Sequence, residues 1–546
     1  MKKTNFMSGA IIATLGIIAC KVLGLVYVIP FYAIIGTMGR SLYSYAYSIY
    51  SMFVNVSTSG VPLAISKSVS EYDTLGNYEA KERIYKLGKR IMTIFGFICF
   101  LLMFIFAEGL ARYIMGNATG GNSIKDIAYV IRVVSTALLF VPLLSVARGY
   151  VQGSKYIQIS SIANIIEQLV RVLVVVLGSY LAIKVFDLGV TNGVAISVFG
   201  ATVGAIAASI YILLKINKNK SKFKVKNDNS VKISDKELIK KIIVYAVPFI
   251  IIAVMKSAYG LVDTFTVVKG LTSVGFDTIT AETASSVIVT WGNKFNTIIA
   301  SICLGVAVSL IPSISSSLVV NDMKSVNDKV NQAFQMIIYL TLPMAIGISF
   351  LSRPIWTVFY GIDSLELGSA MLMFTIFTSV SYSMYSILVD ANQAMNNTKL
   401  TFIILGSCVL LKIVLNTPMI HLFNAIGIKG YYAPAFTDIL IQLLIFLVVL
   451  IYFRKKYHFA YKKTVMNSLK TIVCSLVMLI CLIGLKLIIN QYLVGGRMIS
   501  MVSLAVYSIV GMIIYFVLSY KIGLVDSIFG KDRIDRYLKK FHLKKS

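Results

Sequence analysis

The chain has 546 residues, of which 57% are hydrophobic and only 14% are charged, and this balance excludes a soluble globular protein. The 52 basic and 23 acidic residues leave a net charge of +29, and the basic residues gather in stretches between apolar runs. This pattern is typical of the loops of a membrane protein and does not indicate nucleic-acid binding.

Apolar runs of more than about 18 residues recur along the whole sequence, and each can cross a hydrocarbon layer of ~30 Å as a helix. The first run follows Lys2 and Lys3 and is too long for the core of a signal peptide, so we expect it to be retained. The runs predict an all-α polytopic membrane protein with about fourteen transmembrane helices, at 8–36, 41–69, 88–110, 124–150, 157–185, 189–216, 239–268, 284–313, 330–352, 369–391, 399–423, 430–453, 467–490 and 498–521.

The basic residues predict the orientation of these helices, because loops on the cytoplasmic side carry the excess of Lys and Arg. Basic stretches at 81–90, 215–241, 454–463 and 521–545 alternate with loops that hold one or two basic residues each. Both termini are therefore expected in the cytoplasm, and the protein in the cell membrane. A polybasic cytoplasmic face also attracts anionic membrane lipids.

The long polar stretch "KINKNKSKFKVKNDNSVKISDK" is expected to be a flexible linker that separates six helices from eight. The two sides look related: Gln152 precedes Arg171 by 19 positions, and Gln393 precedes Lys412 by 19. Chance similarity between apolar segments is the alternative. We predict two pseudo-symmetric six-helix lobes and two further helices, with divisions at 1–216 (N-lobe), 217–238 (linker), 239–453 (C-lobe), 454–521 (helices 13 and 14) and 522–546 (basic tail).

No motif for catalysis or metal binding stands out. The six cysteines all fall in predicted spans, and His421, His458 and His542 are far apart. The sequence has no phosphate-binding loop of the G-x-x-x-x-G-K-[ST] type, no H-E-x-x-H and no G-x-S-x-G. We therefore expect no cofactor, no metal and no enzymatic activity, and energy must come from a gradient or a partner.

Ionisable residues inside the spans are the places where a transporter binds its substrate or ions. They are Lys21, Arg132, Glu167, Arg171, Lys256, Asp263, Lys294, Asp390, Lys412 and Asp438.

Several of these have a structural interpretation. Glu167 and Arg171 stand four apart on one helix face and most simply neutralise each other. Arg132 and Arg148 lie close enough to helix ends for their side chains to reach the interface, and Lys21 does so too if its span starts later. Lys256 and Lys294 lie roughly 15 Å into their spans and are harder to explain in this way.

Buried cations that outnumber nearby carboxylates indicate an anionic ligand, because an unpaired ammonium in hydrocarbon costs several kcal/mol. An exporter of cationic drugs would instead place Asp or Glu at these depths. Asp263, Asp390 and Asp438 keep that alternative open.

Short motifs at matching positions resemble a known family. They are "KVLG" in the first span, "GVPLAISKSVSEY" at the end of the second, "ARGYVQG" at 147–153, "EQLVRV" at 167–172 and "GVAVSLIPSIS" at 305–315. In this order they resemble the multidrug/oligosaccharidyl-lipid/polysaccharide (MOP) flippase superfamily. Fourteen helices, where the drug-exporting members have twelve, make the chain most similar to the Gram-positive MurJ/YtgP/SpoVB branch.

The resemblance implies a V-shaped pair of six-helix lobes around a cationic cavity, with helices 13 and 14 forming a lipid-facing groove. It implies that lipid II, the undecaprenyl-pyrophosphate-linked peptidoglycan precursor, is turned between leaflets by alternating access. The family's arginine before "VLG" falls on Lys21, and its arginine in helix 8 falls on Lys294. The second arginine of helix 1 falls on Tyr27.

An arginine pair of helix 2 in the family falls near Val54 and Asn55, and Lys256 is the candidate that compensates for its loss. The expected substrate-binding residues are Lys21, Lys256, Lys294, Arg148, Arg171 and Asn55.

Lipid II is the first choice of substrate. Another undecaprenyl-linked glycan, or a sporulation-specific version of the same activity, is the alternative within transport. A cation-coupled multidrug antiporter and a non-transporting scaffold for cell-wall enzymes are the alternatives from other classes. Expected partners are the lipid-linked glycan, anionic membrane lipids and proteins of cell-wall synthesis.

Overall fold

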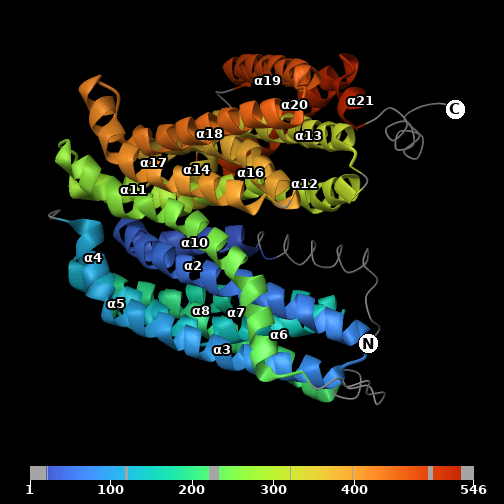
Figure 1. The fold of residues 1–546 in the computed structure, drawn as a ribbon. Coiled ribbons are helices and arrows are strands. Elements are labelled where there is room, and N and C mark those ends of the chain that lie inside the picture. Colours follow the sequence, from blue (N-terminus) through green and yellow to red (C-terminus); the bar gives the residue numbers. More distant parts are fainter. Residues whose placement is uncertain are drawn as a thin grey trace. The chain divides into compact units, whose positions relative to one another are not determined.

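The computed structural model describes residues 20, 23–116, 121–219, 233–319, 321–395, 397–489 and 496–529. Within these ranges all regular elements are helical and no strand is present, as the composition predicts (Figure 1). Among the described residues, twelve helices are long and apolar enough to span a membrane, so the protein is a multi-pass membrane protein.

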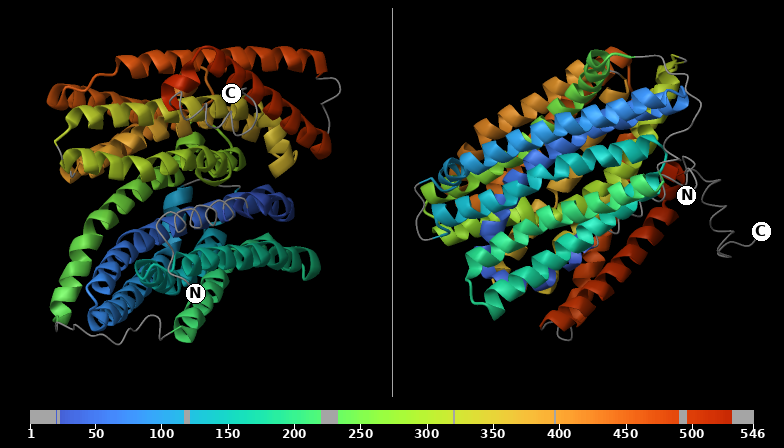
Figure 2. Two further views of the ribbon diagram at one scale, coloured as in Figure 1. Left: turned by 90° about the vertical axis from the view of Figure 1, so that its right-hand side faces the viewer. Right: turned by 90° about the horizontal axis from the view of Figure 1, so that it is seen from below.

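The chain forms two compact units, Met1–Val289 and Thr290–Ser546. In the first unit α2 packs against α3, α6 and α10, and α7 packs against α8; Figure 2 shows the same helices from two further sides. Its helices are α2 (Val28–Thr74), α3 (Tyr78–Ile105), α4 (Ala107–Met115), α5 (Ile124–Ser135), α6 (Val141–Gly153), α7 (Ile157–Leu173), α8 (Val190–Lys218), α10 (Asp235–Ser273) and α11 (Thr278–Ser286), with a short 3-10 helix at Thr136–Leu139 and π-helical turns at Val174–Gly178 and Leu181–Val185.

In the second unit α12 packs against α13 and α16, and α13 also contacts α19. Its helices are α12 (Asn293–Val319), α13 (Met323–Phe350), α14 (Ser352–Tyr360), α15 (Leu365–Thr375), α16 (Thr378–Ala394), α17 (Thr398–Ala425), α18 (Ala433–Tyr457), α19 (Lys462–Ile489), α20 (Arg497–Lys521) and α21 (Leu524–Phe529), with a π-helical turn before α12 at Val287–Trp291 and a 3-10 turn before α18 at Gly430–Tyr432.

Helix α2 joins parts of two predicted spans. Gly36 inside it has φ 64° and ψ −176°, a left-handed backbone that glycine adopts without strain, so the helix direction changes there. The apolar run Leu23–Thr74 therefore counts once among the twelve spans, and α12, which covers most of the predicted span 284–313, is not among them. The count of fourteen and the division into repeated lobes stay predictions.

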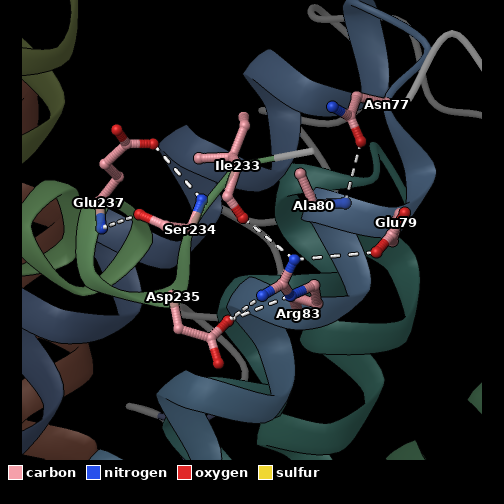
Figure 3. Close-up of polar contacts among 8 residues, drawn as sticks. All are labelled: Asn77, Glu79, Ala80, Arg83, Ile233, Ser234, Asp235 and Glu237. Atoms are coloured by element: carbon pink, nitrogen blue, oxygen red, sulfur yellow. Dashed lines mark hydrogen bonds and ion pairs between the residues drawn. The ribbon is translucent and has the colours of Figure 1, made fainter. Parts of the chain in front are cut away.

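An ion pair and a hydrogen bond join α3 to the start of α10 on the predicted cytoplasmic side (Figure 3). Helix α10 begins with a capping box, in which the Ser234 hydroxyl accepts from the Glu237 backbone N–H and the Glu237 carboxylate accepts from the Ser234 N–H. Arg83 of α3 forms an ion pair with Asp235 at 2.6 Å and donates to the Ile233 carbonyl at 3.0 Å. These contacts fix where α10 enters the membrane beside α2.

Candidate functional site

Arg148 of α6 and Glu167 of α7 form an ion pair between Nη2 and Oε2, with only 18% of each side chain exposed. The helices are joined by a three-residue turn, so residues 19 apart in the chain face each other across the hairpin. Glu167 therefore takes Arg148 as its ion-pair partner, and not Arg171 on the same helix as the sequence predicts. Arg148 on the neighbouring helix faces Glu167 directly, whereas Arg171 lies one turn further along the same helix as Glu167. That Arg148 reaches the interface stays a prediction.

Arg171 is held by aromatic residues of α2. It donates to the Tyr50 hydroxyl at 3.3 Å, and its guanidinium lies 5.9 Å from the ring centroids of both Tyr47 and Tyr50. Tyr47 in turn stacks on Tyr43, with centroids 5.5 Å apart. Among the described residues Arg171 forms no ion pair, because Glu167 is taken by Arg148. Arg171 is thus a half-buried cation that contacts aromatic side chains.

Asn55 and Lys256 lie at one contact between α2 and α10. The Asn55 side-chain amide donates to the Ser257 hydroxyl at 3.4 Å, and Lys256 is the next residue on α10. Both Asn55 and Lys256 are exposed, and within the described ranges the Lys256 ammonium has neither a hydrogen bond nor an ion pair. Lys256 is thus a second cation of the first unit that can receive an anion.

The other two candidates lie elsewhere. Lys294 is half-buried near the start of α12, in the second unit, with its ammonium 5.7 Å from the Trp291 ring centroid. Lys21 lies outside the described residues. In the first unit, Arg148 of α6 pairs with Glu167, which lies one turn from Arg171 on α7, and Asn55 of α2 contacts Ser257, the neighbour of Lys256 on α10. The assignment of all six residues to a binding site remains a proposal.

The second unit contains a buried ion pair that the sequence analysis left as two separate charges. Lys412 of α17 lies 2.6 Å from Asp438 of α18 and also donates to the Pro434 carbonyl at 3.2 Å. The Lys412 side chain is fully buried and that of Asp438 is 13% exposed. Asp438 is thus compensated from within the protein, which reduces its value as a site for a cationic drug or a coupling ion.

Glu282 is a buried acid that sequence reasoning missed because it precedes the predicted span 284–313. It lies in α11 with 1% of its surface exposed and accepts from the Asn122 backbone N–H at 3.1 Å and from the Asn122 side-chain amide at 2.9 Å. The same amide donates to the Met38 carbonyl at 3.1 Å. A Cβ at Gly121 would lie 2.7 Å from the Glu282 carboxyl carbon, so only glycine permits this approach. The sequence feature that could have indicated this buried acid is its position as a single acidic residue just ahead of a long apolar run.

Glu282 should make stability depend on pH. Burial raises its pKa to about 7 against the opposing effect of the Asn122 hydrogen bonds. Because the folded pKa exceeds the unfolded one, the folded state binds more protons between them, so the stability that Glu282 contributes is fully present below about pH 4.5 and is lost as pH rises through about 7. Glu282→Gln should remove this fall, on the order of 3 kcal/mol. Melting temperatures of both forms in detergent at pH 5 and pH 8 would measure it, with the exposed Glu366→Gln as control; a wild-type difference that persists in Glu282→Gln would contradict the assignment.

Comparison with known proteins agrees with this architecture. A family model described as "Polysaccharide biosynthesis protein" matches residues 6–318, and a model described as "MatE" matches residues 284–417. The "Lipid II flippase MurJ" of Bacillus subtilis (strain 168) is 29% identical over 541 residues, covering 97% of each chain.

Two solved structures share the fold. "Lipid II flippase MurJ, inward closed conformation" has a TM-score of 0.67 at 16% identity and covers 96% of this chain and 100% of its own. An inward-facing multidrug resistance MATE family transporter of the MOP superfamily has a TM-score of 0.66 at 11% identity and covers 80% of this chain and 94% of its own. The longer flippase aligns with nearly the whole chain, whereas the MATE transporter leaves a fifth of it unmatched.

Proposed function

Because the chain belongs to the polysaccharide biosynthesis protein family of the MOP flippase superfamily, we propose that it moves lipid II from the inner to the outer leaflet of the cytoplasmic membrane. The observation that carries this proposal is the end-to-end similarity to the lipid II flippase of Bacillus subtilis, at 97% coverage of both chains. The relatives are flippases and transporters, and we propose transport by alternating access with no chemical step.

The proposed ligand-binding groups are cations that meet the diphosphate of lipid II. In the first unit Lys256 and Arg171 support this role, since neither forms an ion pair within the described ranges. Arg148 is neutralised by Glu167, so in this proposal the pair holds α6 against α7 and leaves Arg171 to the substrate. Lys21 and Lys294 complete the set at the positions that correspond to arginines of the family, and Asn55 adds a neutral donor beside Lys256.

Alternating access requires contacts that close one side of the membrane at a time, and two groups of contacts in the first unit support a proposal for them. On the predicted cytoplasmic side α10 is tied to α3 through Arg83 and Asp235, and to α2 through Lys241 and Glu71, 2.6 Å apart. At the opposite end α11 is tied to the loop before α5 through Glu282 and Asn122. We propose that these two groups of contacts open in turn as lipid II passes.

Growth rescue is the experiment that tests the proposed substrate. In a strain depleted of its own lipid II flippase, expression of this chain should restore growth and the delivery of lipid II to the outer leaflet. Failure to rescue, with normal abundance in the membrane, would favour another undecaprenyl-linked glycan or a sporulation-specific role. Uptake and efflux of cationic drugs in the same strain would test the antiporter alternative, which the Lys412–Asp438 pair disfavours.

The membrane potential should drive the movement. An inside-negative potential favours outward transfer of an anionic headgroup by ~2.3 kcal/mol per charge per 100 mV, so a diphosphate with two charges gains roughly 5 kcal/mol, less what moving lysines carry back. Dissipating a potassium-diffusion potential in proteoliposomes should therefore slow flipping at least ~tenfold. A rate that does not change would point to a separate ion gradient as the energy source.

A further inference from the structure

A cavity of about 730 Å³ lies within the second unit, between the first half of α13, the start of α19 and the short helix α21. Its lining contains amide side chains of α13, two lysines of α19 and Ser527 of α21. The basic stretch 454–463 next to it places this cavity on the predicted cytoplasmic side of the membrane. None of the residues proposed to bind lipid II lines it.

The wall of the cavity is built by a continuous chain of hydrogen bonds. The Thr464 hydroxyl donates to the side-chain oxygen of Asn331 at 2.5 Å, and the Gln335 side-chain amide donates to the Thr464 hydroxyl at 3.0 Å. Asn467 donates to Gln335 at 2.7 Å and to Ser527 at 2.9 Å. Because these buried groups satisfy one another, the wall is formed before any ligand binds, and the charged residues at the rim determine what enters.

The rim carries net positive charge. Lys462 and Lys463 form the first turn of α19; both are exposed and, in the part of the chain that the structure describes, neither forms an ion pair. Asp328 is the acidic residue of the lining, and within the described ranges it also forms no ion pair. Two lysines and one aspartate give the lining a net charge of +1. The first turn of α19 contains no acidic residue. The N-terminus of a helix also favours a negative charge, because its first backbone N–H groups have no partner within the helix.

The surroundings identify the anion as part of an amphiphile. Immediately beyond the two lysines, α19 exposes Val465, Met466 and Leu469, and in a membrane such a helix face contacts acyl chains. Charge favours an anion over a basic peptide segment at this rim; residues 530–546, for example, contain seven basic and two acidic residues and do not complement it. The ligand should therefore combine an anionic phosphate head with apolar chains.

We propose that this cavity is a binding site for an anionic glycerophospholipid of the inner leaflet. The phosphate of its headgroup contacts Lys462, Lys463 and the N-terminal N–H groups of α19, while its acyl chains lie along Val465, Met466 and Leu469. Binding links α19 to α13 and α21, so the lipid stabilises the attachment of the two C-terminal helices. The inference does not depend on the identity of the transported substrate.

The test uses the full-length protein in detergent, titrated with phosphatidylglycerol while its melting temperature is recorded. Lys462→Gln/Lys463→Gln should need at least tenfold more phosphatidylglycerol for the wild-type shift, whereas Lys462→Arg/Lys463→Arg should respond like the wild type. The matched control is Arg454→Gln/Lys455→Gln, which removes the same charge from exposed residues of the same stretch that do not line the cavity. Phosphatidylcholine should give no shift.

Three outcomes would overturn the proposal. An equal loss in the control variant would mean that the basic face attracts lipids without a site. A full shift with inorganic pyrophosphate would mean a small-anion site, and tighter binding of undecaprenyl diphosphate than of phosphatidylglycerol at these lysines would assign the cavity to the substrate. Lys462→Gln/Lys463→Gln could melt at a lower temperature than the wild type even without lipid. In that case native mass spectrometry at low temperature counts the phosphatidylglycerol molecules that each form retains, and the variant should retain fewer than the wild type.

Discussion

Alanine at Lys21 or at Lys294 is expected to reduce delivery of lipid II to the outer leaflet at least ~tenfold, while arginine at either position should preserve it. A charge-assisted hydrogen bond to a phosphate contributes roughly 1.5–3 kcal/mol, which corresponds to a factor of about 10 to 100 in binding. The family resemblance aligns both positions with arginines, and the sequence predicts both inside membrane spans, where a substrate anion would compensate a cation. Charge should therefore matter more than the shape of the side chain.

Accessibility of lipid II to an external enzyme that cleaves its headgroup measures this effect in cells that depend on each variant. Lys21→Glu should be at least as defective as Lys21→Ala, and Lys222→Ala in the predicted linker should behave like the wild type. Immunoblots of membrane fractions show whether each variant inserts at normal abundance. If lipid II is as accessible in Lys21→Ala cells as in wild-type cells, Lys21 does not belong to the binding site, and its side chain would instead extend to the membrane interface.

Removing one member of the Lys412–Asp438 pair is expected to give the largest loss of stability. Lys412→Ala leaves the Asp438 carboxylate in a site that is only 13% exposed, and breaking a buried pair in this way costs about 3–5 kcal/mol. The double variant Lys412→Met/Asp438→Leu removes both charges and should recover most of this loss. Thermal unfolding in detergent would measure it, with the exposed Lys399→Ala on the same helix expected to change the free energy of unfolding by less than about 0.5 kcal/mol.

The double variant also separates two functions. If the pair only holds α17 against α18, the stable double variant should still flip lipid II at a rate close to that of the wild type. Loss of flipping at normal stability and abundance would instead show that Asp438 takes part in coupling to a cation, as the antiporter alternative requires.

The sequence by itself determined the class of protein, the position of most helices and the family. In hydrocarbon every backbone N–H and C=O group must be bonded within its own helix, so a long apolar run specifies a spanning helix without help from its neighbours. The motifs around Lys21, Arg148 and Arg171 resembled those of the flippase superfamily before any contact was known, and the match of the family model to residues 6–318 confirmed the resemblance.

Only the tertiary structure decided which charged groups meet. Glu167 pairs with Arg148 across a hairpin and not with Arg171 one turn away, Asp438 is compensated by Lys412, and Glu282 is buried against Asn122. Spacing along one helix states which residues share a face, but partners on other helices depend on which helices are neighbours and on how each is rotated about its axis. That rotation follows from side-chain packing over the whole bundle, which no local pattern in the sequence contains.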